Sequence, residues 1–355
     1  MPRPSAPVRS TTPAPNPRTP SPRPEPGRLS TTFHCPRDPS KNRGSVRSSL
    51  ALIATAGLVA VLSGCAAAAP QVSPGQSSDV VTVSGKFGEE PRVEFPTPLA
   101  PSTTQCTEVI EGEGELLEDD QFVLLGASIF NGTTGEEAQV IGYDDQAAPL
   151  AMGAAETPIA FTKGLTCARE GSRVVIVAPS EELVNPSQDP EGAEGGDSLV
   201  AVFDVMRAFP ARAVGTPQLA RDGFPAVVLA PDGRPGITVP KGDPPTKEES
   251  EVEVLKRGAG EVVEAGDTIV VQYTGVTWAG GAVFESTWQN GAPTTLTVGE
   301  GSEMVEGVSK AVIGQAVGSQ VGVIVPPAEG FADQATADIP AGSTLFYVID
   351  ILGVI

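Results

Sequence analysis

The chain has 355 residues, a length that allows two domains of ordinary size. Only 5% of the residues are aromatic, whereas glycine (40) and proline (35) are abundant, which favours strands, turns and linkers over long helices. Residues 1–47 hold nine basic and two acidic residues, which leaves 14 basic against 42 acidic residues in the rest of the chain. A field of that sign repels nucleic acid, so we exclude nucleic acid as a partner.

The chain contains one histidine, His34, which lies upstream of a predicted export signal. If that segment is removed, the working protein has no imidazole. This excludes Ser-His-Asp and Cys-His mechanisms and argues against an ordinary zinc site. We therefore predict a function that needs no metal and no cofactor.

The N-terminal region reads as an extension followed by an export signal. Residues 1–45 are rich in proline, serine, threonine and arginine and cannot form a core, so we predict a disordered or untranslated extension. Residues 46–65 have a basic start, an apolar run and a small-residue end, the pattern of a secretory signal peptide. The signal ends in L-S-G-C at Cys65, which resembles the bacterial lipobox. A lipid on Cys65 would hold the protein at the outer face of the plasma membrane; the alternative is a plain signal peptide with an incidental cysteine.

The next segment, residues 66–104, is rich in small and polar residues and reads as a linker, although residues 80–94 could pair as an edge strand. An internal repeat follows: G-S-R-V-V-I-V-A-P at 171–179 matches G-S-Q-V-G-V-I-V-P at 318–326. A nearly constant shift along the chain predicts two copies of one fold.

We place the first copy at residues 105–214 and the second at residues 245–355. Residues 215–244, with many glycines, prolines and charges, read as a linker and a first hairpin. Cys106 and Cys167 both fall in the first copy, and in an oxidising compartment we predict a disulfide between them; two free buried thiols are the alternative.

The second copy shows strand periodicity at 252–255, 268–274 and 344–351. The apolar spacing of Val305, Val308 and Val312 predicts one short helix against a sheet. Residue types and spacings of this kind indicate an α+β domain.

Three runs in the second copy carry a family resemblance. They read V-V-Q-Y-T-G-V-T-W-A-G-G-A-V-F-E-S-T-W at 270–288, V-G-S-Q-V-G-V-I-V-P-P-A-E-G-F at 317–331 and I-P-A-G-S-T-L-F-Y-V-I-D-I at 339–351. Together they resemble the FKBP-type peptidyl-prolyl cis-trans isomerases. The resemblance implies two FKBP-like domains, each an antiparallel β-sheet wrapped around one short α-helix, and an enzyme that accelerates rotation about the bond before proline.

The resemblance also implies a set of site residues. Aromatic walls would come from Tyr273, Phe284, Phe331 and Tyr347, Val308 would form the floor, and Ile339 would offer its backbone N–H to the substrate carbonyl. The remaining members are Glu285, where the family has Asp, and Met304 and Val305 at the border.

Several positions depart from the family pattern. The floor is commonly Trp and is Val308 here, Phe331 lacks a tyrosine hydroxyl, and Thr294 stands where an aromatic is frequent. We predict reduced but real activity and weak binding of the family's macrolide inhibitors.

The first copy lacks the site residues. At a shift of 147 residues, Gly126 takes the place of Tyr273, Glu137 that of Phe284 and Ala138 that of Glu285. We expect a degenerate, inactive domain. The whole protein would act on unfolded or proline-containing exported polypeptides and contact the membrane through its lipid anchor. The alternative function is a peptide-binding holdase chaperone without catalysis.

Overall fold

A computed structural model describes residues 72–144, 146–183, 196–245, 247–299 and 301–355. The predicted N-terminal extension and the export signal with Cys65 lie outside the described residues. Within those ranges, no helix is long and apolar enough to cross a membrane.

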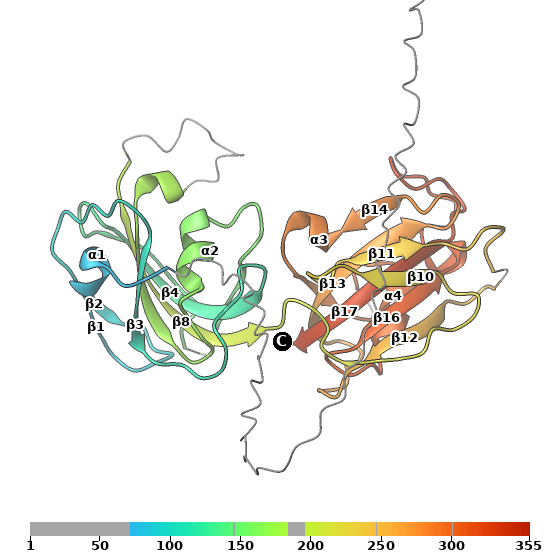
Figure 1. The fold of residues 1–355 in the computed structure, drawn as a ribbon, viewed down its shortest axis with the longest axis horizontal. Helices are drawn as coiled ribbons and strands as arrows, with labels where there is room; N and C mark the ends of the chain where they lie inside the picture. Colours follow the sequence, from blue (N-terminus) through green and yellow to red (C-terminus); the bar gives the residue numbers. More distant parts are fainter. Residues whose placement is uncertain (1–71, 145, 184–195, 246, 300) are drawn as a thin grey trace, which may run out of the picture. The chain divides into compact units, whose positions relative to one another are not determined.

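The first sheet has six strands, all paired antiparallel, in the order β3-β7-β8-β4-β5, with β6 also paired to β4 (Figure 1). One short helix, α2 (Ile159–Leu165), contributes Leu165 and Phe161 to the core on one face of this sheet. The strands are β3 (Gln105–Ile110), β4 (Phe122–Asn131), β5 (Glu137–Ile141), β6 (Ala148–Ala151), β7 (Arg173–Ala178) and β8 (Leu199–Phe209).

The second sheet repeats this order as β12-β16-β17-β13-β14, with β15 on β13 and the two-residue β9 (Thr216–Pro217) added beside β12. Its helix is α4 (Glu306–Val312), and the shorter α3 (Thr287–Asn290) follows β14. The strands are β12 (Glu251–Arg257), β13 (Thr268–Thr277), β14 (Val283–Ser286), β15 (Thr294–Thr297), β16 (Gln320–Val325) and β17 (Leu345–Val354).

The central strands are buried on both faces, which explains their continuous apolar sequences. All six residues of β7 and all six of β16 are buried. A helix covers the inner face of each sheet, and a hairpin with neighbouring apolar residues covers the outer face. Strands covered on both sides carry unbroken valine and isoleucine runs instead of alternating with polar residues.

The hairpin over the first sheet comes from β1 (Thr82–Ser84) and β2 (Arg92–Glu94), preceded by the one-turn α1 (Gln76–Asp79). Val81 and Leu99 are buried here, and Phe95 packs edge-to-face on Phe130 of β4, 6.0 Å between ring centroids. The described part of residues 66–104, expected to be a linker, is therefore folded onto the first sheet. Short strands with little alternation gave a weak signal, and their burial depends on contacts distant in sequence.

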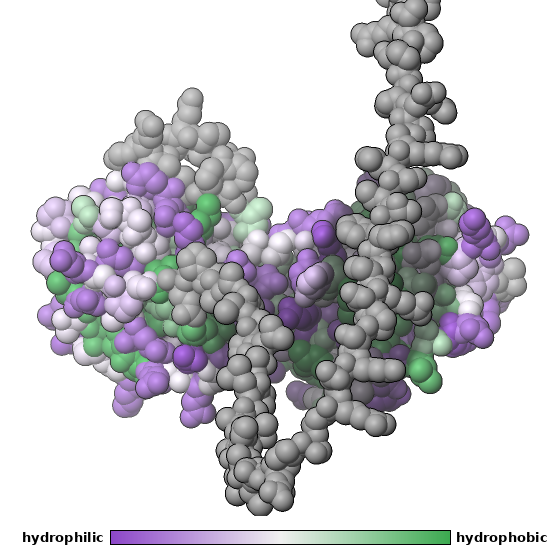
Figure 2. Space-filling view, in the orientation of Figure 1, coloured by the Kyte–Doolittle hydropathy of each residue, from purple (hydrophilic) through white to green (hydrophobic). Residues whose placement is uncertain are grey.

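The second sheet has an equivalent hairpin, β10 (Ala226–Leu229) with β11 (Pro235–Thr238). Val227 and Ile237 pack against the outer face of the sheet, where Trp278 and Phe346 are buried. The predicted first hairpin of residues 215–244 thus lies over the sheet. On the visible surface, hydrophilic residues are interspersed with smaller apolar areas (Figure 2).

Cys106 of β3 and Cys167, which follows α2, are bonded to each other in the structure, with their Cα atoms 6.5 Å apart. The bond joins a strand of the first sheet to the end of its helix. It therefore links two elements of the first core.

The strand register corrects the alignment of the two copies by one residue. Ala127 pairs with Phe203, and at the same place in the second sheet Tyr273 pairs with Ile349. Ala127, and not Gly126, is therefore the counterpart of Tyr273. Gln121, and not Asp120, is the counterpart of Asp267, because both accept a hydrogen bond from the N–H three residues earlier. The second copy has one more residue between β15 and α4 than the first has between β6 and α2, so the shift of 147 holds only beyond that point. A slip of one residue moves every side chain to the other face of a strand.

Candidate active site

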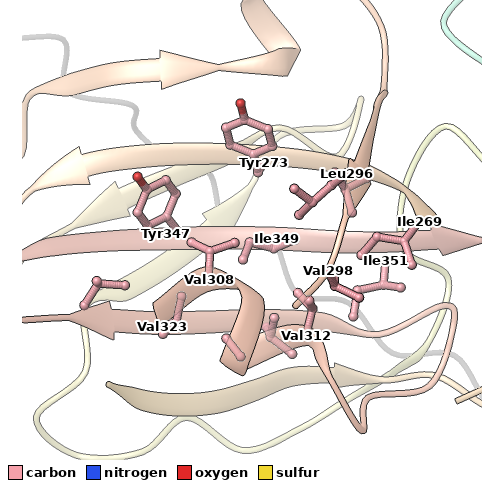
Figure 3. Packing of buried hydrophobic residues seen from close by; sticks show 14 of the residues in the cluster. Ile269, Tyr273, Leu296, Val298, Val308, Val312, Val323, Tyr347, Ile349 and Ile351 are labelled. Atoms are coloured by element: carbon pink, nitrogen blue, oxygen red, sulfur yellow. The ribbon is translucent and has the colours of Figure 1, made fainter. Parts of the chain in front are cut away.

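The two tyrosines of the second sheet meet because β13 and β17 are adjacent. Gly275 of β13 pairs with Tyr347, and Tyr273 lies two residues before Gly275, on the same face of the sheet. Their ring centroids are 6.4 Å apart at 54°. Both rings are largely buried, with 7% of Tyr273 and 1% of Tyr347 exposed, and they lie above Val308 of α4 (Figure 3).

Phe284 of β14 completes the aromatic cluster. Its ring meets Tyr347 edge-to-face, with centroids 5.5 Å apart at 86°. Gly275 makes this contact possible: a Cβ there would lie 2.5 Å from Cζ of Phe284 and 2.8 Å from Cε1 of Tyr347. The Y-T-G motif contains this glycine, but the motif alone does not reveal its role.

The other apolar site residues surround these rings. Val308 and Ile339 are buried members of the same hydrophobic core. The half-buried residues that pack against it include Phe284, Met304, Val305 and Phe331. All eight apolar residues predicted for the site therefore lie in one cluster, with four of them partly open to solvent.

Glu285 adds one charge at the edge of the cluster. It is exposed, and its Oε1 accepts a hydrogen bond of 2.6 Å from the hydroxyl of Tyr273. Burial, followed by this hydrogen bond, raises the pKa of Tyr273 well above its ordinary range. Burial and then the charge of Glu285 raise the pKa of Tyr347 in the same direction. Both tyrosines therefore stay protonated at neutral pH, and neither acts as a base.

The structure shows a competitor for one of the expected substrate contacts. The N–H of Ile339, expected to be available to a substrate carbonyl, donates a hydrogen bond of 3.1 Å to Oγ1 of Thr336. The N–H of Thr336 donates in turn to the carbonyl of Ile339, at 2.9 Å. The loop between Phe331 and Ile339 satisfies its own backbone, as a buried N–H requires. A substrate carbonyl would have to displace the Thr336 hydroxyl, a competitor that the sequence motif did not reveal.

The first copy lacks this aromatic cluster. By strand register, Ala127 stands at the place of Tyr273, Ala201 at that of Tyr347 and Ala138 at that of Phe284, which corrects the predicted Glu137. The helix carries a ring instead: Phe161, the third residue of α2 as Val308 is of α4, packs edge-to-face on Phe203 of β8, with centroids 5.1 Å apart.

The arrangement suits a reaction without proton transfer. The cluster offers aromatic and aliphatic surface, one exposed carboxylate and backbone groups. Within the described ranges, no three histidine, cysteine, aspartate or glutamate side chains are grouped as they would be in a metal site. The site can bind an apolar ring and the amide next to it in a poorly hydrated environment.

Comparison with known proteins identifies the family. Residues 260–352, which span the aromatic cluster, match the family described as FKBP-type peptidyl-prolyl cis-trans isomerase. An FK506-binding protein of Streptomyces anulatus is 30% identical over 123 residues, which cover 34% of this chain and 97% of that protein. The chain belongs to the FKBP-type peptidyl-prolyl cis-trans isomerases. The predicted family and enzyme class are therefore confirmed.

Other relatives of this FKBP-type isomerase match over a similar length. FK506-binding protein 2 of Dictyostelium discoideum is 32% identical over 92 residues, 26% of this chain and 68% of that protein. Peptidyl-prolyl cis-trans isomerase FKBP14 of Mus musculus is 32% identical over 120 residues, 33% of this chain and 56% of that protein. These matches cover between about a quarter and a third of this isomerase chain. That is about the length of one sheet together with its helix and hairpin.

Proposed function

We propose that residues 245–355 catalyse cis-trans isomerisation of Xaa-Pro bonds in exported polypeptides, at the aromatic cluster of Tyr273, Phe284 and Tyr347. The convergence of these three rings, with Tyr273 and Tyr347 above Val308, is the observation that carries the proposal. In the first copy, three alanines take the places of these rings, so we assign no catalysis to it.

Rotation of the prolyl bond needs little chemistry. The barrier for a peptide bond is about 18–20 kcal/mol, and a rate enhancement of ~10⁴ needs about 5.5 kcal/mol of it removed. Planar amide resonance is strongly polar and is lost as the bond twists. A poorly hydrated aromatic site therefore disfavours the planar ground state relative to the twisted transition state.

Each residue receives a role on this basis. The prolyl ring lies against Tyr273, Phe284 and Tyr347, above the side chain of Val308. The half-buried Met304, Val305 and Phe331 contact the neighbouring residues of the substrate. The N–H of Ile339 binds the substrate carbonyl once the hydroxyl of Thr336 has moved away from it.

Two of these residues should weaken the activity and the binding of macrolides. Val308 is smaller than the tryptophan usual in the family, so it leaves contact area unused. Phe331 offers no hydroxyl, which removes a hydrogen bond of roughly 0.5–1.5 kcal/mol. Two of the relatives above are named as FK506-binding proteins, and we propose weak binding of such macrolides here.

The decisive experiment measures exchange between the cis and trans forms of an Ala-Pro peptide by NMR, with the full-length chain. We expect turnover, and a loss of about tenfold or more in kcat/KM for Tyr273→Ala and Phe284→Ala, a loss equivalent to about 1.4 kcal/mol. Tyr143→Phe is the matched control, because Tyr143 is the one tyrosine of the chain outside the aromatic cluster and lies in the first copy. No turnover by the unaltered chain would refute the proposal.

The holdase chaperone remains the competing proposal. The first copy favours it, because that copy keeps the sheet and the helix while losing the aromatic cluster. Suppression of aggregation of a reduced, unfolded test protein, without turnover of the Ala-Pro peptide, would support the holdase. Turnover that depends on Tyr273 supports the enzyme.

The extracytoplasmic location is also proposed. L-S-G-C at Cys65 suits lipid attachment, and a Cys106–Cys167 disulfide suits an oxidising compartment. Growth of a bacterial host with labelled palmitate should label the full-length protein and not its Cys65→Ala variant. Equal absence of label from both proteins would exclude the lipid anchor.

A further inference from the structure

The polypeptide around the active site carries an unusual excess of negative charge. Residues 258–355 contain 11 acidic residues and one basic residue, Lys310. The ammonium group of Lys310 is held by two carboxylates, Glu306 at 2.8 Å and Glu329 at 2.5 Å. The one positive charge of this segment is therefore already balanced.

Four of the acidic residues adjoin the aromatic cluster in the chain. Glu285 follows Phe284, and Glu303 precedes Met304. Asp338 precedes Ile339, and Asp333 lies two residues after Phe331; all four acidic residues are exposed. Across the described residues, no ion pair joins these four carboxylates to a lysine or arginine. We call them the acidic rim.

Glu285 shows that the acidic rim reaches the site itself. Its carboxylate is fixed by the 2.6 Å hydrogen bond from the hydroxyl of Tyr273. Its charge also acts on Tyr347, whose pKa it helps to raise after the larger effect of burial. A charged group of the substrate held close to these rings would therefore meet this field at short range.

We infer that the site selects its substrates by charge, and that it favours Xaa-Pro segments with lysine or arginine next to the proline over those with glutamate or aspartate. Carboxylates at the border of a binding site attract cations during encounter and repel anions, and salt weakens both effects. This inference rests on the proposed function, because it describes the substrates of the same aromatic cluster.

The test uses the full-length chain and three peptides that differ at one position: Lys-Pro, Ala-Pro and Glu-Pro. NMR exchange replaces a coupled protease, so no second enzyme adds its own charge preference. We expect kcat/KM for Lys-Pro to exceed that for Glu-Pro about tenfold at low salt, with the ratio falling below about threefold in 0.5 M salt. The Ala-Pro peptide should lie between the two.

Removing two of the four charges of the acidic rim isolates the cause. The double variant Glu303→Gln/Asp338→Asn should lower the Lys-Pro to Glu-Pro ratio at least about threefold at low salt. The matched control, Glu261→Gln/Glu264→Gln, removes the same charge from exposed residues that precede β13, and it should leave the ratio unchanged.

The possible outcomes separate the charge selection from the isomerase function. A ratio near one at low salt, or equal effects of the two double variants, overturns the charge selection while Ala-Pro turnover keeps the isomerase function. Absence of Ala-Pro turnover overturns the proposed function and the charge selection with it.

Discussion

The buried Arg173 on the first sheet offers the sharpest test of how the repeat is stabilised. Its guanidinium donates to both carboxylate oxygens of Asp204, at 2.5 and 2.7 Å, and both side chains are almost wholly buried. The same group also donates to the carbonyls of Gly85, Lys86 and Glu89, which lie in the loop between β1 and β2. Arg173 therefore anchors the outer hairpin to the sheet.

We expect Arg173→Met to destabilise the first copy by about 3–5 kcal/mol, because it leaves the charge of Asp204 buried without a cation, with only the backbone N–H of Gly88 still donating to it. The three hairpin carbonyls should cost little, since their loop is largely exposed and water can replace the guanidinium. With a urea m-value of about 2 kcal/mol per M, the loss corresponds to a midpoint lower by about 2 M.

Urea denaturation of the full-length chain can separate the two copies. Both tryptophans of the chain, Trp278 and Trp288, lie in the second copy, so their fluorescence reports its unfolding. Far-ultraviolet circular dichroism reports the strands of both sheets. For Arg173→Met we expect the dichroism to show an earlier transition while the tryptophan transition keeps its midpoint.

The double variant Arg173→Met/Asp204→Leu distinguishes the cost of a buried charge without its ion-pair partner from the cost of lost packing. Replacing both partners removes the unpaired carboxylate, so we expect the double variant to be more stable than Arg173→Met alone. A double variant as unstable as the sum of the two single variants would refute this reasoning. So would Arg173→Met with an unchanged dichroism midpoint.

Three further predictions follow from individual contacts. Burial raises the pKa of Asp350, so the folded protein loses stability as the pH rises above the pKa that Asp350 has in the unfolded chain. The free energy of unfolding of Asp350→Asn, measured in urea, should therefore rise relative to that of the unaltered chain between pH 4 and pH 7. A fall of this difference over the same range would contradict the prediction. Gly275→Ala should lower kcat/KM about tenfold or more in the peptide assay, because its Cβ would displace two rings, and an unchanged rate would contradict the packing. Reduction of the Cys106–Cys167 bond should lower the dichroism midpoint, since closing a loop of this length contributes about 4 kcal/mol on the loop-entropy model; coincident midpoints with and without reductant would contradict it.

The sequence motifs predicted which side chains gather at the site, because they combine positions that are far apart in the chain. Y-T-G, V-P-P and I-P mark β13, the end of β16 and the approach to β17. Once these strands pair, Tyr273 and Tyr347 must share a face. The glycine between them was visible in the motif, yet its role depends on the approach of two rings that only the fold reveals.

Other features of the structure could not be predicted by pattern alone. The hydrogen bond from Ile339 to Thr336 depends on how a loop closes on itself, and no periodicity records that. The β1–β2 hairpin has three residues in each strand, too few for alternation to stand out. The alignment of Gly126 with Tyr273 failed because a constant shift hides a single inserted residue, and strand pairing is sensitive to one residue.

The two copies fill the space between sheet and helix from opposite sides. In the first copy the sheet supplies Ala127 and Ala201, and the helix supplies Phe161. In the second copy the sheet supplies Tyr273 and Tyr347 at these two places, and the helix supplies Val308 at the place of Phe161. Protein cores are filled to a nearly constant density, and exchanging large and small residues between the two walls at these three places keeps the space filled. The aromatic cluster of the second copy therefore belongs to the sheet, where Gly275 and Phe284 complete it, and the helix contributes the smaller Val308.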